Sequence, residues 1–506
     1  MKTRGGRFLL AFICLWIGSA QAQKPVAIRI HPEKTYQTIH NFGASDAWSC
    51  PFVGNWPDAK RNAIADLLFS RDTLPSGSAK GIGLSLWRFT IGAGSAEQGE
   101  ASGIKDEWRR APSFLDEKGN FTSKNAGGQL WFLKAAKVRG VPHFLAFCNS
   151  PPVQLTRNKK AFADHSVTNL DPQNYRTFAD FLAQTIGGIE HETGIKVNYV
   201  SPVNEPQWDW SDGGQEGTPF RNSELAALVK EMDAVFTGKN VLAKIILPEA
   251  GQIDFLFDAN GKPDRGKQVH AFFAPGLAFN VGRFASVEKA IAAHSYFTTS
   301  PKEKAIRLRK RLADTVNRYP GLRYWQSEYC ILGDNTGEIN GSGRDTGIVS
   351  ALYVAGVIHH DLTVANASAW QWWTAISAYD YKDGLIYVDK NKSDGNFTPA
   401  KTLWALGNWS RFVRPGMRRF EAEMAGEKNL LVSAFGSEDH REIVCVVVNP
   451  ETRAQDVIFP GEKGSGLQPK QMYITGSAES LGKHLLRGKT VRIPPQSIAT
   501  VILEKR

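Results

Sequence analysis

Residues 197–206, VNYVSPVNEP, decide the fold prediction for this chain. Their first half is apolar and β-rich, and Pro206 takes the chain out of an extended run directly after Glu205. Residues 323–330, RYWQSEYC, have the same form, with Glu328 at the end of the apolar part and Gly333 soon after. A carboxylate in this position points out of the C-terminal end of a parallel sheet, where α/β enzymes build their sites. The two stretches therefore predict a pair of carboxylates that share one pocket.

Outward from these stretches, β-rich runs alternate with helical patterns through the middle of the chain. The predicted strands are 39–44, 84–91, 143–149, 197–204, 243–248, 292–296, 324–328 and 367–373. The predicted helices between them are 58–68, 126–139, 172–193, 223–236, 301–319 and 346–362. Crossover helices imply parallel pairing of the strands, and eight such strands close a barrel. The fold class is thus predicted as α/β, a (β/α)8 TIM barrel.

After residue 412 the pattern changes to short alternating runs separated by Gly, Pro, Ser and Asn. These runs are 430–434, 443–448, 454–459, 471–475, 490–493 and 498–504. With no long helix between them, they predict an appended antiparallel β-sandwich, which an early strand at 26–30 is expected to join. The expected division is a leader at 1–22, a sandwich strand within 23–38, the barrel at 39–410 and the sandwich at 411–506.

The first residues have the pattern of a secretory signal. Lys2, Arg4 and Arg7 precede an apolar run at 8–17, and the small-residue cleavage pattern AQA follows at 20–22. The run is about half of the roughly 20 residues that cross a bilayer. Cys14 lies inside the run without small residues before it, which disfavours a lipid anchor. We therefore expect a secreted or periplasmic protein with no integral membrane segment after cleavage.

Charge and cysteine content exclude some classes of protein. The formal net charge is +11, but Lys and Arg are scattered, apart from a helical cluster at 302–311 that is typical of a solvated face rather than of a nucleic-acid site. The cysteines after the leader have no zinc-site spacing and are too few for a disulfide scaffold; they are Cys50, Cys148, Cys330 and Cys445. We expect no metal, no cofactor and no nucleic-acid partner, whereas oligomeric state and cysteine pairing stay open.

Five segments carry a resemblance to a known family. They are 41–48 (NFGASDAW), 86–94 (LWRFTIGAG), 149–152 (NSPP), 203–210 (VNEPQWDW) with 215–217 (QEG), and 325–328 (WQSE). On these segments the chain resembles glycoside hydrolase family 30, and the extension from 206 to 217 is similar to its endo-β-1,6-galactanase branch. The resemblance covers the chain after the leader and implies a barrel with a side β-sandwich built from both termini. One departure is the run SPPVQL at 150–155, which lacks an aromatic residue that many relatives carry there to wall a sugar subsite.

The resemblance also implies roles for individual residues. Glu205 is implied as the acid/base and Glu328 as the nucleophile, and Asn204 is implied to bind the sugar 2-hydroxyl. Arg88 ends the second strand, where its guanidinium can hold the nucleophilic carboxylate in its ionised form. The alternative for Arg88 is an ordinary ion pair with another acid.

Further candidates also lie at predicted strand ends. We interpret Asp46 as an acceptor for a sugar hydroxyl, and Glu216 and Glu249 as groups that order loops or reach distal subsites. His294 and Tyr296 end the sixth strand, where the tyrosine can align the nucleophile, although both side chains could equally be core residues.

The chain contains 14 Trp, an aromatic content that suits stacking on sugar faces. The tryptophans beside polar residues at strand ends are the candidates for such stacking; they are Trp208, Trp210, Trp370 and Trp372. Core packing is the alternative interpretation, and we expect it for at least half of all the tryptophans.

Two carboxylates in one pocket predict glycosidic bond cleavage by double displacement with retention, provided that they lie about 5–5.5 Å apart.

Three functions are compatible with the sequence. The first is an endo-acting glycosidase on β-1,6-galactan, such as arabinogalactan side chains. The second is a glycosidase of the same fold that acts on β-1,6-glucan, xylan or a terminal β-linked sugar. The third is a carbohydrate-binding protein without activity, which the intact carboxylate pair disfavours. Chain-length preference and the tolerance of branched or uronic-acid-decorated chains stay open.

Overall fold

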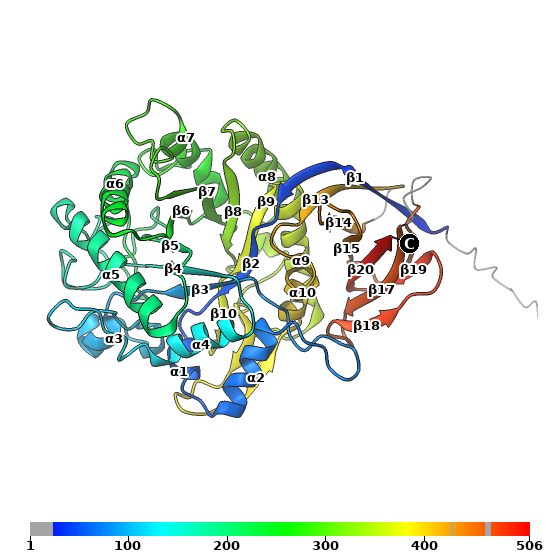
Figure 1. Ribbon diagram of the computed structural model, residues 1–506, viewed down its shortest axis with the longest axis horizontal. Helices are drawn as coiled ribbons and strands as arrows, with labels where there is room; N and C mark the ends of the chain where they lie inside the picture. The colour runs from blue at the N-terminus through cyan, green and yellow to red at the C-terminus, as the bar shows by residue number, and fades with distance from the viewer. Residues whose placement is uncertain (1–23, 427–428, 461–466, 506) are drawn as a thin grey trace, which may run out of the picture.

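The structure, a computed structural model, describes residues 24–426, 429–460 and 467–505, so the predicted leader at 1–22 lies outside the described residues. A closed parallel barrel forms its larger part (Figure 1). The barrel strands are β2 (Asn41–Ser45), β3 (Leu86–Thr90), β4 (His143–Phe147), β5 (Tyr199–Ser201), β6 (Lys244–Ala250), β7 (Val287–His294), β8 (Arg323–Glu328) and β9 (Ala367–Trp372). The predicted TIM barrel is confirmed.

The barrel strands are short and almost completely buried, as expected of a parallel sheet with helices outside it. β9 closes the ring beside β2, with Trp370 opposite Phe42. The largest difference from the predicted bounds is at β7, which begins at Val287 rather than at 292. β5 ends at Ser201 rather than at 204. Pro202 lacks a backbone N–H and cannot continue the ladder, so residues 202–205 already belong to the loop that carries Glu205.

Ten α-helices and five short 3₁₀-helices accompany the described strands. The α-helices are α1 (Cys50–Val53), α2 (Asp58–Phe69), α3 (Ser95–Gln98), α4 (Gly127–Val138), α5 (Tyr175–Thr193), α6 (Asn222–Lys239), α7 (Gln268–Phe273), α8 (Lys302–Val316), α9 (Ile348–Thr363) and α10 (Lys401–Ser410). The 3₁₀-helices are η1 (Gly99–Ser102), η2 (Glu107–Arg109), η3 (Pro172–Asn174), η4 (Ile253–Leu256) and η5 (Asn335–Gly337). The six predicted helices correspond to α2, α4, η3 with α5, α6, α8 and α9. Among the described residues, no helix has the length and apolar character needed to cross a membrane.

A nine-stranded sheet stands beside the barrel, with the order β18-β17-β20-β15-β14-β13-β1-β16-β19. Its strands are β1 (Val26–Thr38), β13 (Arg418–Met424), β14 (Leu431–Gly436), β15 (Glu442–Asn449), β16 (Gln455–Ile458), β17 (Leu467–Thr475), β18 (Gly482–Leu485), β19 (Thr490–Ile493) and β20 (Ser497–Lys505). β1 pairs with β13 in antiparallel and with β16 in parallel orientation, so the first described residues lie within the C-terminal sheet (Figure 1). The parallel β1–β16 pair is the one departure from the predicted antiparallel arrangement.

One strand shows how this sheet joins the barrel. Along β15, Cys445 and Val447 pack into a core formed by the sheet itself, whereas Val444, Val446 and Val448 belong to the core that continues into the barrel. Because successive side chains point to opposite faces, β15 is apolar on both. α9 and α10 lie between the barrel and this sheet (Figure 1). Cys445 is thus the buried core thiol that its sequence context predicts, and all four described cysteines are buried and unpaired.

A small sheet follows the last barrel strand and reaches over the mouth of the barrel. It consists of β10 (Thr374–Ser377), β11 (Gly384–Val388) and β12 (Phe397–Pro399). The sequence analysis did not predict it. The turn between β10 and β11 brings Tyr381 and Asp383 to the wall of the pocket described below.

Candidate active site

A cavity of about 520 Å³ opens at the C-terminal ends of the barrel strands. Polar residues from several strands meet apolar and aromatic residues in its lining, as in sites that bind small polar ligands. The lining residues are Trp48, Arg109, Asn204, Glu205, Trp208, Trp210, Gln215, Tyr296, Phe297, Glu328, Cys330, Ile331, Leu332, Trp373, Tyr381 and Asp383.

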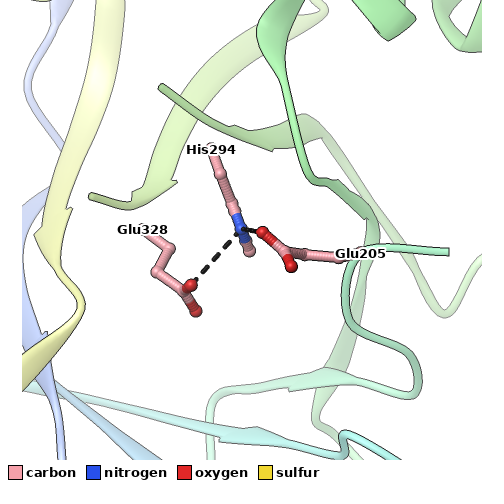
Figure 2. A group of neighbouring side chains, drawn as sticks. All are labelled: Glu205, His294 and Glu328. Atoms are coloured by element: carbon pink, nitrogen blue, oxygen red, sulfur yellow. Dashed lines mark hydrogen bonds and ion pairs between the residues drawn. The ribbon is translucent and has the colours of Figure 1, made fainter. Parts of the chain in front are cut away.

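Glu205 and Glu328 both line this cavity. Figure 2 shows their side chains on either side of His294. Glu328 is the last residue of β8, and Glu205 follows β5 by four positions. One carboxylate oxygen of Glu205 and one of Glu328 lie within 4.8 Å of each other. Both side chains are buried, with residue exposures of 3% for Glu328 and 7% for Glu205. The structure therefore brings together the two carboxylates that the sequence paired.

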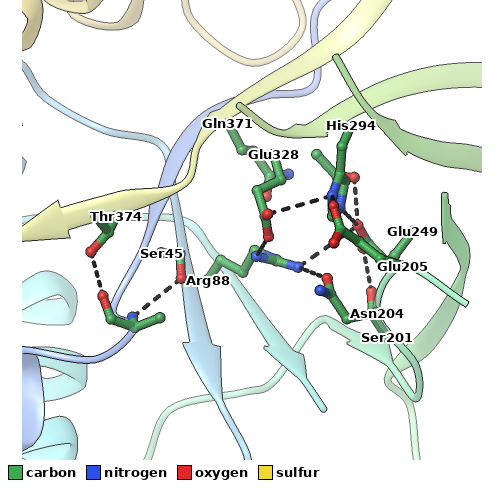
Figure 3. A network of polar contacts seen from close by, with 12 residues as sticks. Ser45, Arg88, Ser201, Asn204, Glu205, Glu249, His294, Glu328, Gln371 and Thr374 are labelled. Atoms are coloured by element: carbon green, nitrogen blue, oxygen red, sulfur yellow. Dashed lines mark hydrogen bonds and ion pairs between the residues drawn. The ribbon is translucent and has the colours of Figure 1, made fainter. Parts of the chain in front are cut away.

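Arg88, the middle residue of β3, joins Glu328 to the residue before Glu205 (Figure 3). Its Nη1 donates to Glu328 Oε2 at 2.6 Å, and its Nη2 donates to Asn204 Oδ1 at 2.9 Å. The ring of Phe147 lies 3.7 Å from the guanidinium carbon and supports its plane. Arg88 thus pairs with the expected carboxylate, and its fork also fixes the Asn204 amide.

His294 and Tyr296 both contact the carboxylate pair. His294 Nδ1 lies 2.8 Å from Glu205 Oε1 and 3.4 Å from Glu328 Oε1 (Figure 2). The Tyr296 hydroxyl donates to Glu328 Oε1 at 3.0 Å. Both residues are buried at the end of β7 or just after it, and their placement fits alignment of the carboxylates better than ordinary core packing.

Glu249 is a third carboxylate of this cluster, a position that the sequence analysis did not predict. It is fully buried in β6 and accepts hydrogen bonds from Ser201 at 2.6 Å and Ser327 at 2.5 Å (Figure 3). His294 Nε2 lies 3.2 Å from its Oε2. Glu249 therefore lies behind the pocket, against the far side of the imidazole, and not in a distal subsite.

The backbone at the two glutamates that flank His294 is strained. Glu205 has φ 46° and Glu249 has φ 56°, a left-handed conformation that L-residues other than Gly rarely adopt. The Glu205 N–H donates to the Glu249 carbonyl at 2.8 Å, which ties the two strained positions together. Strain of this kind persists where surrounding contacts over-determine the backbone, and it concentrates at functional sites.

Charge balance indicates where the protons of the cluster reside. Burial raises the pKa of Glu205, and the Glu328 charge adds to this against the opposing effects of His294 and Arg88. For Glu249, burial is outweighed by Arg88 and by hydrogen bonds from His294 and Ser201, so its pKa falls to about 2. For His294, burial is outweighed by the charges of Glu328, Glu205 and Glu249, so its pKa rises to about 10. Two cations thus face three carboxylates, and Glu205 is the carboxylate that favours the proton.

The same cluster is, among the described residues, the group whose geometry could hold a metal ion. A ring nitrogen of His294 and one oxygen each of Glu205 and Glu328 lie within 4.8 Å of one another. However, both ring nitrogens of His294 are within hydrogen-bonding distance of carboxylates, and its pKa of about 10 keeps the ring protonated at neutral pH. The contacts as they stand form an ion-pair network, and a metal ion bound there would have to displace the proton of the imidazole.

The aromatic wall differs in part from the sequence expectation. Trp208 and Trp210 line the cavity, and Trp210 donates from its indole to the carbonyl of Glu205 at 3.1 Å. Trp370 and Trp372 are buried in β9 and do not line it. The wall uses Trp373 instead, packed edge-on against Trp48 at 5.2 Å. The chain leaves β9 after Trp372, so strand alternation alone could not identify the ring that lines the cavity.

Asp46 and Glu216 lie behind the wall of the cavity and hold loops in place. Asp46 Oδ1 accepts from the N–H and hydroxyl of Thr90, and its Oδ2 accepts from Gln129, so its oxygens are engaged away from the cavity. Glu216 accepts from the Ala93 and Ser95 backbone N–H groups and from the Ser95 hydroxyl. The structure therefore gives Asp46 protein partners where the sequence suggested a sugar hydroxyl, and Glu216 takes the loop-ordering position that the sequence left open.

A barrel with paired carboxylates at its C-terminal face, one ion-paired to arginine and the other favouring the proton, is the architecture of a glycosidase. The sequence profile of O-glycosyl hydrolase family 30 matches residues 25–387, and the chain belongs to this family.

The chain is also similar to individual proteins, among them enzymes that act on different polysaccharides. An endo-β-1,6-galactanase of Hypocrea rufa is 23% identical over 431 residues, which cover 81% of this chain and 79% of that protein. A glucuronoxylanase, XynC of Bacillus subtilis (strain 168), is 26% identical over 381 residues, which cover 74% and 76%. The crystal structure of a conserved exported protein from Bacteroides fragilis superposes with a TM-score of 0.85 at 33% identity, covering 94% of this chain and all of that one. The chain is therefore a glycosidase of family 30 whose relatives differ in substrate.

Proposed function

We propose that this protein is a retaining, endo-acting glycosidase that cleaves β-1,6-galactan, such as the side chains of arabinogalactan. The observation that carries the chemistry is the carboxylate pair, whose nearest oxygens lie within 4.8 Å. This separation fits the roughly 5–5.5 Å between carboxyl groups of retaining enzymes better than the roughly 6.5–9.5 Å of inverting ones. The substrate is supported by the galactanase of Hypocrea rufa, whose similarity spans most of both chains.

In the first step, Glu328 attacks the anomeric carbon while Glu205 gives its proton to the departing glycosidic oxygen. Arg88 and Tyr296 each donate to one oxygen of Glu328, which holds the carboxylate in place in the cavity lining. The bond from the sugar to the leaving oxygen breaks as the bond to Glu328 forms, which gives a glycosyl-enzyme and a shortened chain.

In the second step, Glu205 takes a proton from water, and the water attacks the anomeric carbon and releases Glu328. Esterification of Glu328 removes the negative charge that raises the pKa of Glu205, so the same residue can act first as acid and then as base. Asn204, held by Arg88, is the residue that we assign to the sugar 2-hydroxyl.

Product analysis on β-1,6-galactan, with wild type beside Glu328→Gln, tests this function. Short galacto-oligosaccharides from the wild type alone are the expected result. Galactose alone would leave the chemistry intact but make the enzyme exo-acting. Cleavage of β-1,6-glucan or xylan instead would assign another substrate to the same carboxylates, and the glucuronoxylanase relative keeps this the main alternative. Binding without turnover on every β-glycan would favour the binding-protein reading.

We further propose that the protein is secreted or periplasmic. The leader pattern at 1–22 and the similarity to a protein described as exported support this location. Amino-terminal sequencing of the protein recovered outside the cytoplasm should begin near Gln23, and a start at Met1 would contradict the proposal.

A further inference from the structure

Asp383 is a carboxylate in the cavity wall that the chemistry above does not use. It precedes β11 in the small sheet over the barrel mouth, and it lines the same cavity as Glu205 and Glu328. The Trp372 indole donates to the Asp383 carbonyl at 2.6 Å and holds its backbone in place. Cys330, two positions after Glu328, also lines the cavity, and the Asp383 charge contributes to the raised pKa of its thiol.

One oxygen of the Asp383 carboxylate has no hydrogen-bond donor, although Ser377 and a backbone N–H hydrogen-bond to the group. The residue is only 6% exposed, and its Oδ1 is buried with no hydrogen-bond partner among the described residues. No Lys or Arg of that part of the chain forms an ion pair with it. Burial raises its pKa to about 6, and Ser377, Arg109 and Arg344 offset this only in part. At neutral pH the carboxylate is therefore mostly ionised while one oxygen remains unsatisfied, which is costly unless a ligand supplies a donor.

The other oxygen acceptors at the base of the cavity are already engaged. Asn204 Oδ1 accepts from Arg88, and the two oxygens of Glu328 accept from Arg88 and Tyr296. Glu205 must keep its proton for the leaving oxygen. Sugar hydroxyls are donors, and Asp383 is a carboxylate of the cavity lining that can accept from them and has no task in the chemistry above.

We propose that Asp383 accepts a hydrogen bond from a ring hydroxyl of the sugar that becomes attached to Glu328, and that it thereby determines sugar specificity. This inference rests on the proposed function and deepens it. In an inner unit of a β-1,6-linked chain, the 1- and 6-oxygens are in linkages, and Asn204 is assigned to the 2-hydroxyl. The 3- and 4-hydroxyls remain for Asp383, and the orientation of the 4-hydroxyl distinguishes galactose from glucose.

The test uses 4-nitrophenyl β-1,6-galactobioside and two analogues that lack the 3- or the 4-hydroxyl on the unit carrying the nitrophenyl group. With the parent substrate, Asp383→Ala should lower kcat/KM by about 10–100-fold, the effect expected when a buried hydrogen-bonding group loses its partner. With the analogue that lacks the bound hydroxyl, wild type and variant should differ by less than about threefold, because the interaction is already absent. Equal losses on all three substrates would overturn the proposal.

Two further variants separate recognition from structure. Asp389→Ala removes an exposed carboxylate at the other end of β11 and should leave all three rates unchanged. Asp383→Asn keeps one acceptor oxygen and a similar shape, so its kcat/KM on the parent substrate should fall less than that of Asp383→Ala. If Asp383→Ala does not fold, Asp383→Asn takes its place in the comparison. A wild type that cleaves only another β-glycoside would refute the galactan substrate. The same comparison, made with deoxy analogues of that glycoside, then decides the role of Asp383.

Discussion

His294 owes its charge to the carboxylates around it, and Glu249 is the one that lies behind the pocket. Glu249→Gln removes a negative charge 3.2 Å from the ring while keeping the shape of the side chain. The pKa of His294, about 10 in the native cluster, should then fall by roughly one unit or more, because an opposite charge in contact favours the charged form. Ring ¹⁵N chemical shifts followed against pH measure this. Ser201→Ala removes a hydrogen bond from Glu249 but not its charge, so it should produce a much smaller shift, and equal shifts in both variants would contradict the charge argument.

Glu205 should show the signature of an acid catalyst in its dependence on the leaving group. In Glu205→Ala, a galactoside with an alkyl leaving oxygen should lose about 10²–10⁴ in kcat/KM, the usual contribution of general acid catalysis. A dinitrophenyl galactoside needs little protonation, so formation of the glycosyl-enzyme should be nearly unaffected, and azide should rescue turnover as the β-glycosyl azide. Rates over a series of leaving groups measure this. Asp209→Asn, an exposed carboxylate of the same loop, serves as the control. A loss that does not depend on the leaving group would assign Glu205 a purely structural role.

The loop after β5 explains why the motif that suggested this family branch extends to residue 217. Trp210 donates to the Glu205 carbonyl at 3.1 Å, and a Cβ at Gly217 would stand 2.5 Å from the Trp210 ring. Glu216, beside this glycine, ties the loop to Ser95. Trp210 thus supports the backbone of the acid/base, and Gly217 leaves room for the Trp210 ring, although neither residue carries out the chemistry.

A methyl group at Gly217 should therefore reduce activity through the loop. In Gly217→Ala, the displaced Trp210 ring no longer supports the Glu205 backbone, and kcat/KM should fall about tenfold or more. The melting temperature should fall by only a few degrees, because the change lies at the cavity rim. Gly187→Ala, in α5, places a methyl group with no atom within 4 Å and should leave activity unchanged. Wild-type activity in Gly217→Ala would show that the loop tolerates the shift.

Elements with a clear period could be predicted from the sequence, and those without one could not. The eight barrel strands and six of the helices were found because apolar runs and amphipathic patterns alternate along 39–373. α10 was missed because every residue from Thr402 to Ser410 is buried, so it has no polar face to reveal a helical period. The small sheet β10–β12 was missed because it follows β9 directly, without the helices that separate the barrel strands along the chain. Without this sheet, Asp383 could not be predicted to lie in the cavity wall. The position of Glu249 in the cluster could not be predicted either, because it depends on contacts between strands that are distant in sequence.

At the scale of the whole molecule, the barrel and the nine-stranded sheet share one core. Phe435, Val444 and Ile498 of the sheet belong to the same buried cluster as the barrel residues. Asn408 of α10 links the two parts: its Nδ2 donates to Thr475 at 2.8 Å, and its Oδ1 accepts from Thr500 at 2.9 Å. The sheet has a core of its own on one face, but its other face packs into the core of the barrel, and β1 also places the start of the described chain in this sheet.

The shared core predicts a single cooperative unfolding transition by calorimetry, with activity lost over the same temperature range. Asn408→Ala removes a buried amide, leaves the Thr475 and Thr500 hydroxyls without these partners and opens a cavity, so it should cost about 2–4 kcal/mol of unfolding free energy. That cost should move the whole transition to lower temperature without splitting it. Asn396→Ala, an exposed amide in the loop before β12, should leave the transition in place. If Asn408→Ala instead produced two transitions, with activity following only the higher one, the sheet would unfold independently of the barrel. Its contacts with α9 and α10 would then be a docking surface rather than part of a common core.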